Sequence, residues 1–211
     1  MTAYRRRLNK GKLKNRLILL LLLLLIIFNF DHIARIFNLH LVSGRLPDEG
    51  IKKIARIFYP FPHKEIIEHY AGTYGVDPYL VVAMMKAESN FNQRAISESG
   101  ALGLMQIMPE TGQWAAKQNG GPPFSPEQLF EVDTNIKLGT WYIADLGKEF
   151  HGDAVLILAA YNGGRGNVRE WLANGTLSTW RDIKAIPFPE TRHYVEKVLN
   201  NYDIYTKLYS E

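Results

Sequence analysis

The hydrophobic residues of this chain first gather in one unbroken block near the N-terminus. Leu17 to Phe28 are twelve apolar residues in succession, and a helix built from them lacks the polar face of a globular helix. Twelve residues are fewer than the roughly 20 that cross a bilayer, but only a few strongly polar side chains follow before Val42. The pattern therefore predicts one membrane-spanning helix over residues 17–38.

Residues 1–16, which precede this block, contain seven lysine and arginine side chains and no acidic one. Positive charge before an apolar segment holds that end of the chain in the cytoplasm. We therefore expect a basic cytoplasmic tail, with the rest of the chain outside the cytoplasm, in the periplasm or on the cell-wall side. A cleaved signal peptide, which would give a secreted protein, combines the same two features. No small-x-small cleavage site follows the apolar block promptly, which favours the uncleaved anchor.

Residues 39–60 have a mixed apolar and charged character and end at Pro60–Phe61–Pro62. Proline interrupts regular structure and restricts the residue before it. The segment therefore predicts a connector between the anchor and a folded domain at residues 61–211.

In the folded part, apolar positions recur mostly at the spacing of helices. The predicted helices are residues 64–74, residues 78–89, one opening at Pro109, a short one at Ser125–Pro126, one from Asp133 to Phe150, one from Asp153 to Tyr161, and residues 189–208. Aspartate is a favoured N-cap, so Asp77, Asp133 and Asp153 are the expected caps. Residues 91–104 are polar and punctuated by glycine, which indicates a folded loop or a small irregular lobe. No alternating run is long enough for a sheet, so the expected fold class is all-α.

Charge and cysteine content exclude several classes of function. The chain has 25 basic and 21 acidic side chains; without the seven basic residues of the tail, 18 basic side chains remain against 21 acidic ones, a net charge of −3. A folded part without a basic surplus predicts no nucleic-acid partner. The absence of cysteine excludes disulfides and thiolate catalysis. The six histidines have no paired ligand spacing, so we expect neither a metal nor a cofactor.

Glu88 is the candidate for acid–base chemistry, because it lies near the C-terminal end of the almost entirely apolar helix predicted at residues 78–89. Apolar surroundings and the negative end of the helix dipole both disfavour the ionised carboxylate. Both effects raise its pKa toward the range that a general acid needs at neutral pH. The alternative is a helix-end glutamate turned to solvent, and the helix pattern alone leaves the two open.

The stretch that starts at Glu88, ESNFNQRAISESGALGLMQIMPETG, resembles the signature of the family-1 lytic transglycosylases. Two later stretches resemble the second and third motifs of that family: Ala160–Asn162 with the glycines after it, and Pro189–Thr191 with Tyr194. The three motifs occur in the family's order and cover about residues 62–208. The resemblance implies the lysozyme-like, α-rich catalytic domain of soluble lytic transglycosylases.

The resemblance also implies a reaction, the cleavage of the β-1,4 bond between N-acetylmuramic acid and N-acetylglucosamine in peptidoglycan. Glu88 would protonate the glycosidic oxygen. As a carboxylate it would then take the proton of the muramic C6 hydroxyl, which closes on C1 to leave a 1,6-anhydro end. An ordinary glycosidase needs a second carboxylate, whereas here the nucleophile belongs to the substrate. A hydrolytic muramidase and a catalytically silent glycan-binding module at the membrane are the alternatives.

The other motif residues are implied to serve the same site. The residues expected to bind the glycan are Ser89, Met105, Gln106, Tyr161, Asn162 and Tyr194. Glu190 is expected to hold these residues in place without contacting the glycan itself. Ordinary structural readings stay open for four of them: a core methionine, an exposed glutamine, a core tyrosine at 161, and a helix-start glutamate that interacts with the dipole. The implied partners are peptidoglycan strands and, through the N-terminal anchor, the membrane.

Overall fold

The computed structural model describes residues 49–120, 124–177 and 183–210. The predicted tail (residues 1–16), the predicted anchor (residues 17–38) and the first part of the predicted connector (residues 39–60) lie outside the described residues. Within the described ranges, no helix is both long enough and apolar enough to cross a membrane. Residues 53–211 form one compact unit, which contains every helix from α4 onward.

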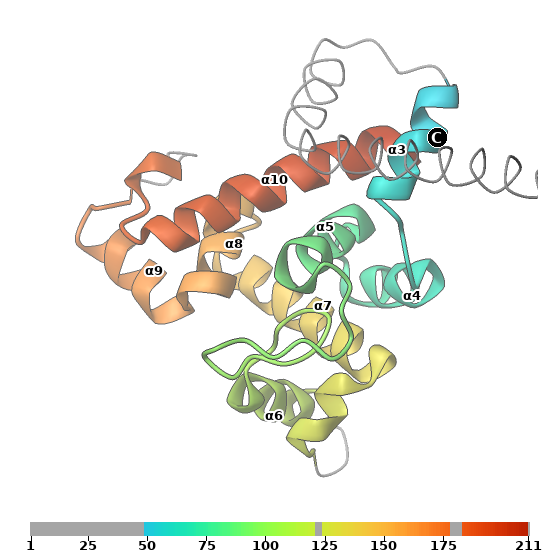
Figure 1. The fold of residues 1–211 in the computed structure, drawn as a ribbon. Helices are drawn as coiled ribbons and strands as arrows, with labels where there is room; N and C mark the ends of the chain where they lie inside the picture. The colour runs from blue at the N-terminus through green and yellow to red at the C-terminus, as the bar shows by residue number, and fades with distance from the viewer. Residues whose placement is uncertain (1–48, 121–123, 178–182, 211) are drawn as a thin grey trace, which may run out of the picture. The chain divides into compact units, whose positions relative to one another are not determined.

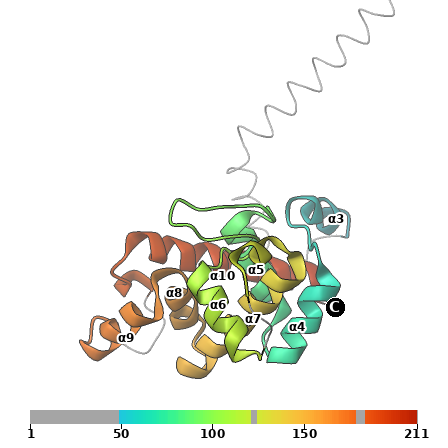
Figure 2. The same ribbon diagram turned by 90° about the horizontal axis from the view of Figure 1, so that it is seen from below.

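The part of the chain that the structure describes is built from helices (Figure 1). In chain order they are α3 (Glu49–Phe58), α4 (Lys64–Tyr74), α5 (Pro78–Ser89), α6 (Pro109–Gln118), the 3-10 helix η1 (Pro126–Phe130), α7 (Val132–Glu149), α8 (Ala154–Gly163), α9 (Arg165–Ala173), the 3-10 helix η2 (Ile183–Ala185) and α10 (Pro189–Tyr209). The long helix α10 packs along α5 and α8, as Figure 2 shows from a second side. Helices α4, α6 and α8 pack against α7.

Helix α5 occupies the residues that the sequence predicts, 78–89, and its sequence explains both ends. The Asp77 carboxylate accepts a hydrogen bond from the backbone N–H of Tyr79 (2.8 Å), and Pro78 takes the first helical position. Residues 81–85 are fully buried. The helix ends at Asn90, which adopts a left-handed conformation with φ 47°. An almost wholly buried helix therefore runs through the middle of the domain.

The caps of the next two long helices differ from one another. Asp153 caps α8 as predicted, since its carboxylate accepts hydrogen bonds from the N–H groups of Val155 and Leu156. The predicted start of α7 at Asp133 is wrong by two residues, because Glu131 is the N-cap and Asp133 lies in the first turn. The Asp133 carboxylate accepts a hydrogen bond from the hydroxyl of Tyr70 on α4 (2.9 Å) instead. The Asp133 carboxylate, which the local sequence pattern predicted to cap α7, therefore forms a contact between α4 and α7.

Two helices were not predicted. Helix α3 lies inside the predicted connector, and of its side chains from Lys53 onward only Ala55 is buried. Helix α9 follows Gly164, whose φ of 90° lets the chain turn directly out of α8. Only Val168 and Trp171 of α9 are buried, which is too little to show a helical period in the sequence.

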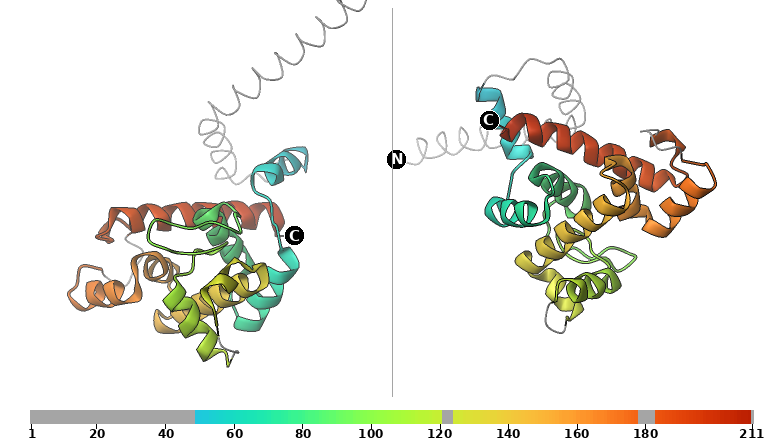
Figure 3. Two further views of the ribbon diagram at one scale, coloured as in Figure 1. Left: turned by 60° about the horizontal axis from the view of Figure 1, so that its bottom comes forward. Right: turned by 180° about the vertical axis from the view of Figure 1, so that it is seen from behind.

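The segment between α5 and α6 is the folded loop that its composition predicts (Figure 3). Two isolated antiparallel bridges, Ile96–Leu102 and Leu102–Ile107, fold it back on itself. Leu102 and Ile107 exchange both backbone hydrogen bonds, at 3.0 and 3.1 Å. The described residues contain no longer ladder, so the loop has no sheet to hold it in place.

Asn135 on α7 holds this loop against the helices. Its side chain is buried, and its Oδ1 accepts a hydrogen bond from the N–H of Met105 (2.8 Å). Its Nδ2 donates to the carbonyls of Leu102 (3.1 Å) and Leu129 (2.7 Å). The loop comes so close here that a Cβ on Gly103 would lie 2.4 Å from Nδ2. One amide therefore satisfies three buried backbone groups of the loop and of η1.

Replacing this amide should destabilise the domain. Asn135→Ala removes three hydrogen bonds to backbone groups, and at about 1 kcal/mol for each we expect a loss of about 3 kcal/mol in the free energy of unfolding. Urea unfolding followed by circular dichroism measures the loss. Asn200→Ala, an exposed position on α10, is the matched control and should change stability by less than about 0.5 kcal/mol. Equal effects of the two variants would contradict the role given to Asn135.

Candidate active site

Glu88 lies in the last turn of α5, the helix against which α10 packs. Its side chain is part-buried. The polar groups that act on it come from the two neighbouring helices: Tyr161 on α8, and Tyr194 and Lys197 on α10. The site is thus assembled from three helices that are far apart in the sequence.

Burial raises the pKa of Glu88 to about 7, while the hydroxyl of Tyr194 and the charge of Lys197 hold it below the value that burial alone would give. The direction is the one expected from the position of Glu88 at the end of an apolar helix. At neutral pH the protonated and ionised forms are both well populated. A group in that condition can give a proton in one step and take one in the next.

Tyr194 is the nearest polar neighbour on α10. Its side chain is 7% exposed, and its hydroxyl has no hydrogen-bond partner of regular geometry among the described residues. The hydroxyl is nevertheless close enough to Glu88 to lower the pKa of the carboxyl group. Burial and the Glu88 charge raise the pKa of Tyr194 well above its usual value, so the hydroxyl keeps its proton near neutral pH. It is a donor available to an oxygen atom beside Glu88.

Tyr161 joins α8 to the loop that follows Glu88. Its hydroxyl donates a hydrogen bond to the carbonyl of Met105 (2.9 Å). Burial and the neighbouring Glu88 charge raise the pKa of Tyr161 well above its usual value. Its ring packs against Tyr142 with the centroids 5.4 Å apart. Tyr161 therefore lies beside Glu88 as the motif implies, but the structure uses its hydroxyl proton internally.

Ser89 at the end of α5 and the loop residues Met105 and Gln106, which are expected to bind the glycan, also have structural partners. The Ser89 hydroxyl donates to the carbonyl of Leu104 (2.7 Å), and Gln106 Nε2 donates to the carbonyl of Gly103 (2.9 Å). Met105 is fully buried against Gly139, where an added Cβ would lie 2.4 Å from its sulfur atom. The side chain of Met105 is thus a core methionine, which was the open alternative. Contact of Ser89, Met105 or Gln106 with a glycan stays a prediction.

Asn162 and Glu190 are both exposed, and neither side chain makes a hydrogen bond or an ion pair with another residue in the described ranges. Glu190 lies in the first turn of α10 and is not among the groups that shift the pKa of Glu88. This arrangement matches the helix-start alternative, in which the carboxylate interacts with the helix dipole. The structure does not bring Glu190 into the group around Glu88.

Sequence reasoning missed Lys197. Its Nζ donates a hydrogen bond to the carbonyl of Ala87 (2.7 Å), the residue before Glu88. The spacing of three residues from Tyr194 places both side chains on one face of α10. That spacing was a usable signal once Tyr194 had been assigned to the site.

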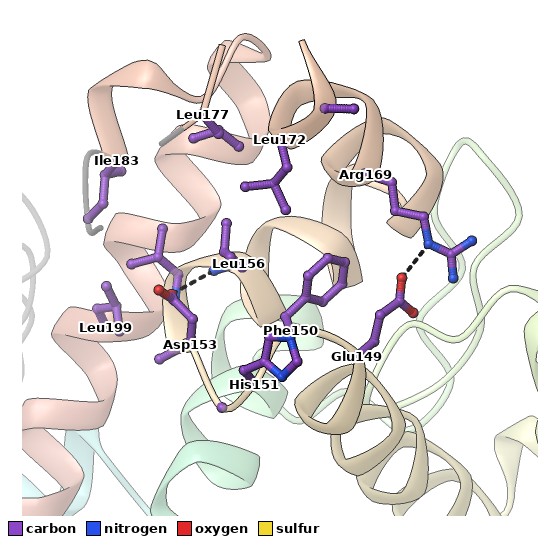
Figure 4. A pocket seen from close by; sticks show the side chains of 14 residues that line it. Glu149, Phe150, His151, Asp153, Leu156, Arg169, Leu172, Leu177, Ile183 and Leu199 are labelled. Carbon is purple, nitrogen blue, oxygen red and sulfur yellow. Dashed lines mark hydrogen bonds and ion pairs between the residues drawn. The ribbon is translucent and has the colours of Figure 1, made fainter. Parts of the chain in front are cut away.

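A cavity of about 1390 Å³ lies elsewhere, between the end of α7, the start of α8 and α9 (Figure 4). Its lining is largely apolar, and two of its charged residues, Glu149 and Arg169, form an ion pair with each other. None of the predicted site residues lines it. The size of this cavity therefore does not decide where the chemistry occurs.

No group of three or more metal-ligating side chains lies together in the described part of the chain.

Comparison with known proteins decides the family. Residues 65–182 match the family described as "Transglycosylase SLT domain". The chain belongs to this family. The matched span contains Glu88, Tyr161 and the first two motifs, whereas Tyr194 and Lys197 on α10 lie after it.

Known relatives of this SLT domain are named lytic murein transglycosylases. The chain is 36% identical over 171 residues to the soluble lytic murein transglycosylase of Escherichia coli (strain K12), which covers 80% of this chain and 26% of that protein. It is 32% identical over 200 residues to the membrane-bound lytic murein transglycosylase C of Edwardsiella ictaluri, covering 84% of this chain and 53% of that protein. The chain thus spans about a quarter to a half of the length of these relatives.

Solved structures confirm the fold of the SLT domain. An inactive Glu-to-Gln variant of the lytic transglycosylase Slt from Pseudomonas aeruginosa matches with a TM-score of 0.66 and 37% identity, over 72% of this chain and 25% of that one. The 70 kDa soluble lytic transglycosylase of Escherichia coli matches with a TM-score of 0.67 and 33% identity, over the same shares of each chain. The all-α, lysozyme-like domain that the motifs imply is therefore confirmed.

The raised pKa of Glu88 predicts how stability depends on pH. The folded domain holds the proton more tightly than the unfolded chain, so ionisation of Glu88 costs stability as the pH rises from about 4.5 through about 7. A glutamine side chain at this position cannot ionise. At pH 8, Glu88→Gln should therefore gain on the order of 2–3 kcal/mol over the wild type relative to their difference at pH 4. Urea unfolding at the two pH values measures the gain.

The matched control is Glu98→Gln, which removes one exposed carboxylate from the loop of the same domain. A gain in stability at pH 8 that this control reproduces would mean that loss of any negative charge is responsible. A difference between Glu88→Gln and wild type that stays constant from pH 4 to pH 8 would contradict the burial of an ionisable Glu88.

Proposed function

We propose that this chain is a peptidoglycan lytic transglycosylase that cleaves the bond between N-acetylmuramic acid and N-acetylglucosamine without water and leaves 1,6-anhydro ends. The observation that carries the proposal is the condition of Glu88. Its carboxyl group is part-buried in an SLT domain, its pKa lies near 7, and the buried hydroxyl of Tyr194 is beside it.

The reaction needs one group that works twice. Protonated Glu88 gives its proton to the glycosidic oxygen as the bond from that oxygen to C1 of the muramic sugar breaks. The carboxylate then takes the proton of the C6 hydroxyl of the same sugar, and the C6 oxygen bonds to C1. Glu88 is protonated again at the end, and no water is consumed. A pKa near the working pH suits both transfers, because neither form of the group is scarce.

The surroundings of Glu88 favour this route over hydrolysis. Retaining and inverting glycosidases hold a second carboxyl group about 5–9.5 Å from the first. Among the residues that the structure describes, no second carboxylate contributes to the pKa of Glu88; the groups that do are Tyr194 and Lys197. Glu98 and Glu110, which follow Glu88 in the first motif, are both exposed. A nucleophile supplied by the substrate fits a site with one carboxyl group.

The relatives support the same chemistry. Two of them carry the name lytic murein transglycosylase, and a Glu-to-Gln variant of a third is described as inactive. The proposal keeps the glycan contacts predicted for the six motif residues, although the side chain of Met105 is fully buried, and it keeps a supporting role for Glu190, which is exposed in the first turn of α10. Among the six, Tyr194 has the strongest support, because its buried hydroxyl lies beside Glu88 and lowers the pKa of the carboxyl group.

We also propose the membrane arrangement that the N-terminal pattern predicts. Residues 1–16 form a cytoplasmic tail, residues 17–38 the anchor, residues 39–60 the connector and residues 61–211 the catalytic domain outside the cytoplasm. The charge asymmetry around the apolar block and the membrane-bound relative support this arrangement. Secretion after signal cleavage is the alternative.

Product analysis tests the activity. Wild-type protein incubated with purified peptidoglycan should release muropeptides with 1,6-anhydro ends, detected by mass spectrometry. Glu88→Gln should bind the same glycan but release product on the order of 10²–10⁴ times more slowly, the usual contribution of a general acid–base group. Glu98→Gln should keep the wild-type rate. Products with reducing ends alone would point to a hydrolytic muramidase, and binding without any product to a silent glycan-binding module.

A reporter that is active only outside the cytoplasm tests the membrane arrangement. Fused after Glu211 in the full chain, it should be active in cells, and the fusion protein should remain in the membrane fraction after washing at high salt and high pH. An active reporter in the soluble fraction would support signal cleavage. An inactive reporter would contradict both the anchor and an extracytoplasmic substrate.

A further inference from the structure

Lys197 holds the end of the helix that carries Glu88. Its Nζ donates to the carbonyl of Ala87 at 2.7 Å. That carbonyl is one of the last four of α5, which have no partner inside the helix. A positive charge at this end also interacts favourably with the helix dipole. One ammonium group thus ties α10 to the turn that presents the Glu88 carboxyl.

The charge of Lys197 lowers the pKa of Glu88, whereas the ammonium group of the neighbouring Lys86 binds other groups. Lys86 Nζ donates to the carbonyl of Phe58 (2.9 Å) and lies 4.7 Å from the centre of the Tyr59 ring. It is not among the groups that shift the pKa of Glu88, while Lys197 is. Of the described cations, Lys197 is therefore the one that acts on the carboxyl group.

The remaining titratable groups that face Glu88 are tyrosines: Tyr161 from α8 and Tyr194 from α10. The pKa values of both are raised well above their usual range, so both stay neutral while Glu88 titrates. They can donate or accept hydrogen bonds, but they bring no charge at neutral pH. Among the groups that shift the pKa of Glu88, Lys197 is therefore the one that carries a charge at neutral pH.

We propose that Lys197 is a positioning residue for Glu88: it fixes the last turn of α5 through the Ala87 carbonyl and places a positive charge that favours the carboxylate form. This inference rests on the proposed acid–base role of Glu88. In the first proton transfer the ammonium group stabilises the carboxylate that forms. Without that charge the carboxyl group would keep its proton to a higher pH.

The test removes the charge and then restores it. In the full chain, Lys197→Met should move the high-pH limb of kcat/KM for peptidoglycan cleavage upward by roughly half a pH unit. An opposite charge close to a buried carboxyl group shifts its pKa by about one to three units, and solvent around the exposed Lys197 weakens the effect. Lys197→Arg keeps the charge and should leave the limb within about 0.2 pH unit of wild type. Lys207→Met, the same change on the same helix at a lysine paired with Asp203, is the matched control.

A second measurement separates this inference from the proposed function. The Glu88 carboxyl carbon, labelled with ¹³C and assigned by its absence in Glu88→Gln, is titrated by NMR in the same variants. It should titrate at a higher pH in Lys197→Met than in wild type or Lys207→Met. This readout decides the role of Lys197 even if wild-type protein releases no anhydro product, an outcome that would overturn the proposed function alone.

Three results would overturn the role of Lys197. The first is a Glu88 titration that is unchanged in Lys197→Met. The second is an equal shift in Lys207→Met, and the third is an equal shift in Lys197→Arg, which retains the charge. Circular dichroism checks that each variant is folded, and Lys197→Gln replaces Lys197→Met if the methionine variant is not.

Discussion

The packing of α5 against α10 is the constraint on which the chemistry of this domain depends. It places a carboxyl group at the end of a helix whose residues 81–85 are fully buried. Ionising a carboxyl group in such surroundings is costly, and the pKa of Glu88 rises to about 7 for that reason. A fold that only needed stability would gain nothing from an acid there, and strongly shifted groups of this kind are concentrated at functional sites.

Polar contacts hold the other side of the site in place. The chain between α5 and α6 contains only isolated bridges, so its position depends on side chains that reach its backbone. Asn135 supplies two such bonds, to Met105 and Leu102, and Ser89 and Tyr161 supply one each to the carbonyls of Leu104 and Met105. Ser89 of the first motif and Tyr161 of the second therefore act on the loop itself. A motif residue can thus be essential for the shape of a site without touching the substrate.

Opposing effects tune the single carboxyl group. Burial raises its pKa, and a hydroxyl and an ammonium group on α10 lower it. With burial alone, the pKa of the carboxyl group would be too high for it to release its proton at neutral pH, and with full exposure the group would be ionised at that pH. The balance lets one residue serve as acid and then as base. This fits a reaction in which the sugar supplies its own nucleophile and no second carboxylate is required.

Several features of this protein could be predicted from its sequence, because they depend on neighbouring residues. Helix α5, its Asp77 cap, the Asp153 cap of α8 and the irregular loop all follow from patterns of neighbouring residues, and the position of Glu88 already indicated the direction of its pKa shift. Tertiary structure decided the rest. It buried Met105, left Glu190 exposed, gave Asp133 to Tyr70, and brought Lys197 to the carbonyl of Ala87, 110 positions away in the chain. Periodicity and capping act over a few residues, whereas the charge and burial around a side chain depend on which distant segments pack against it.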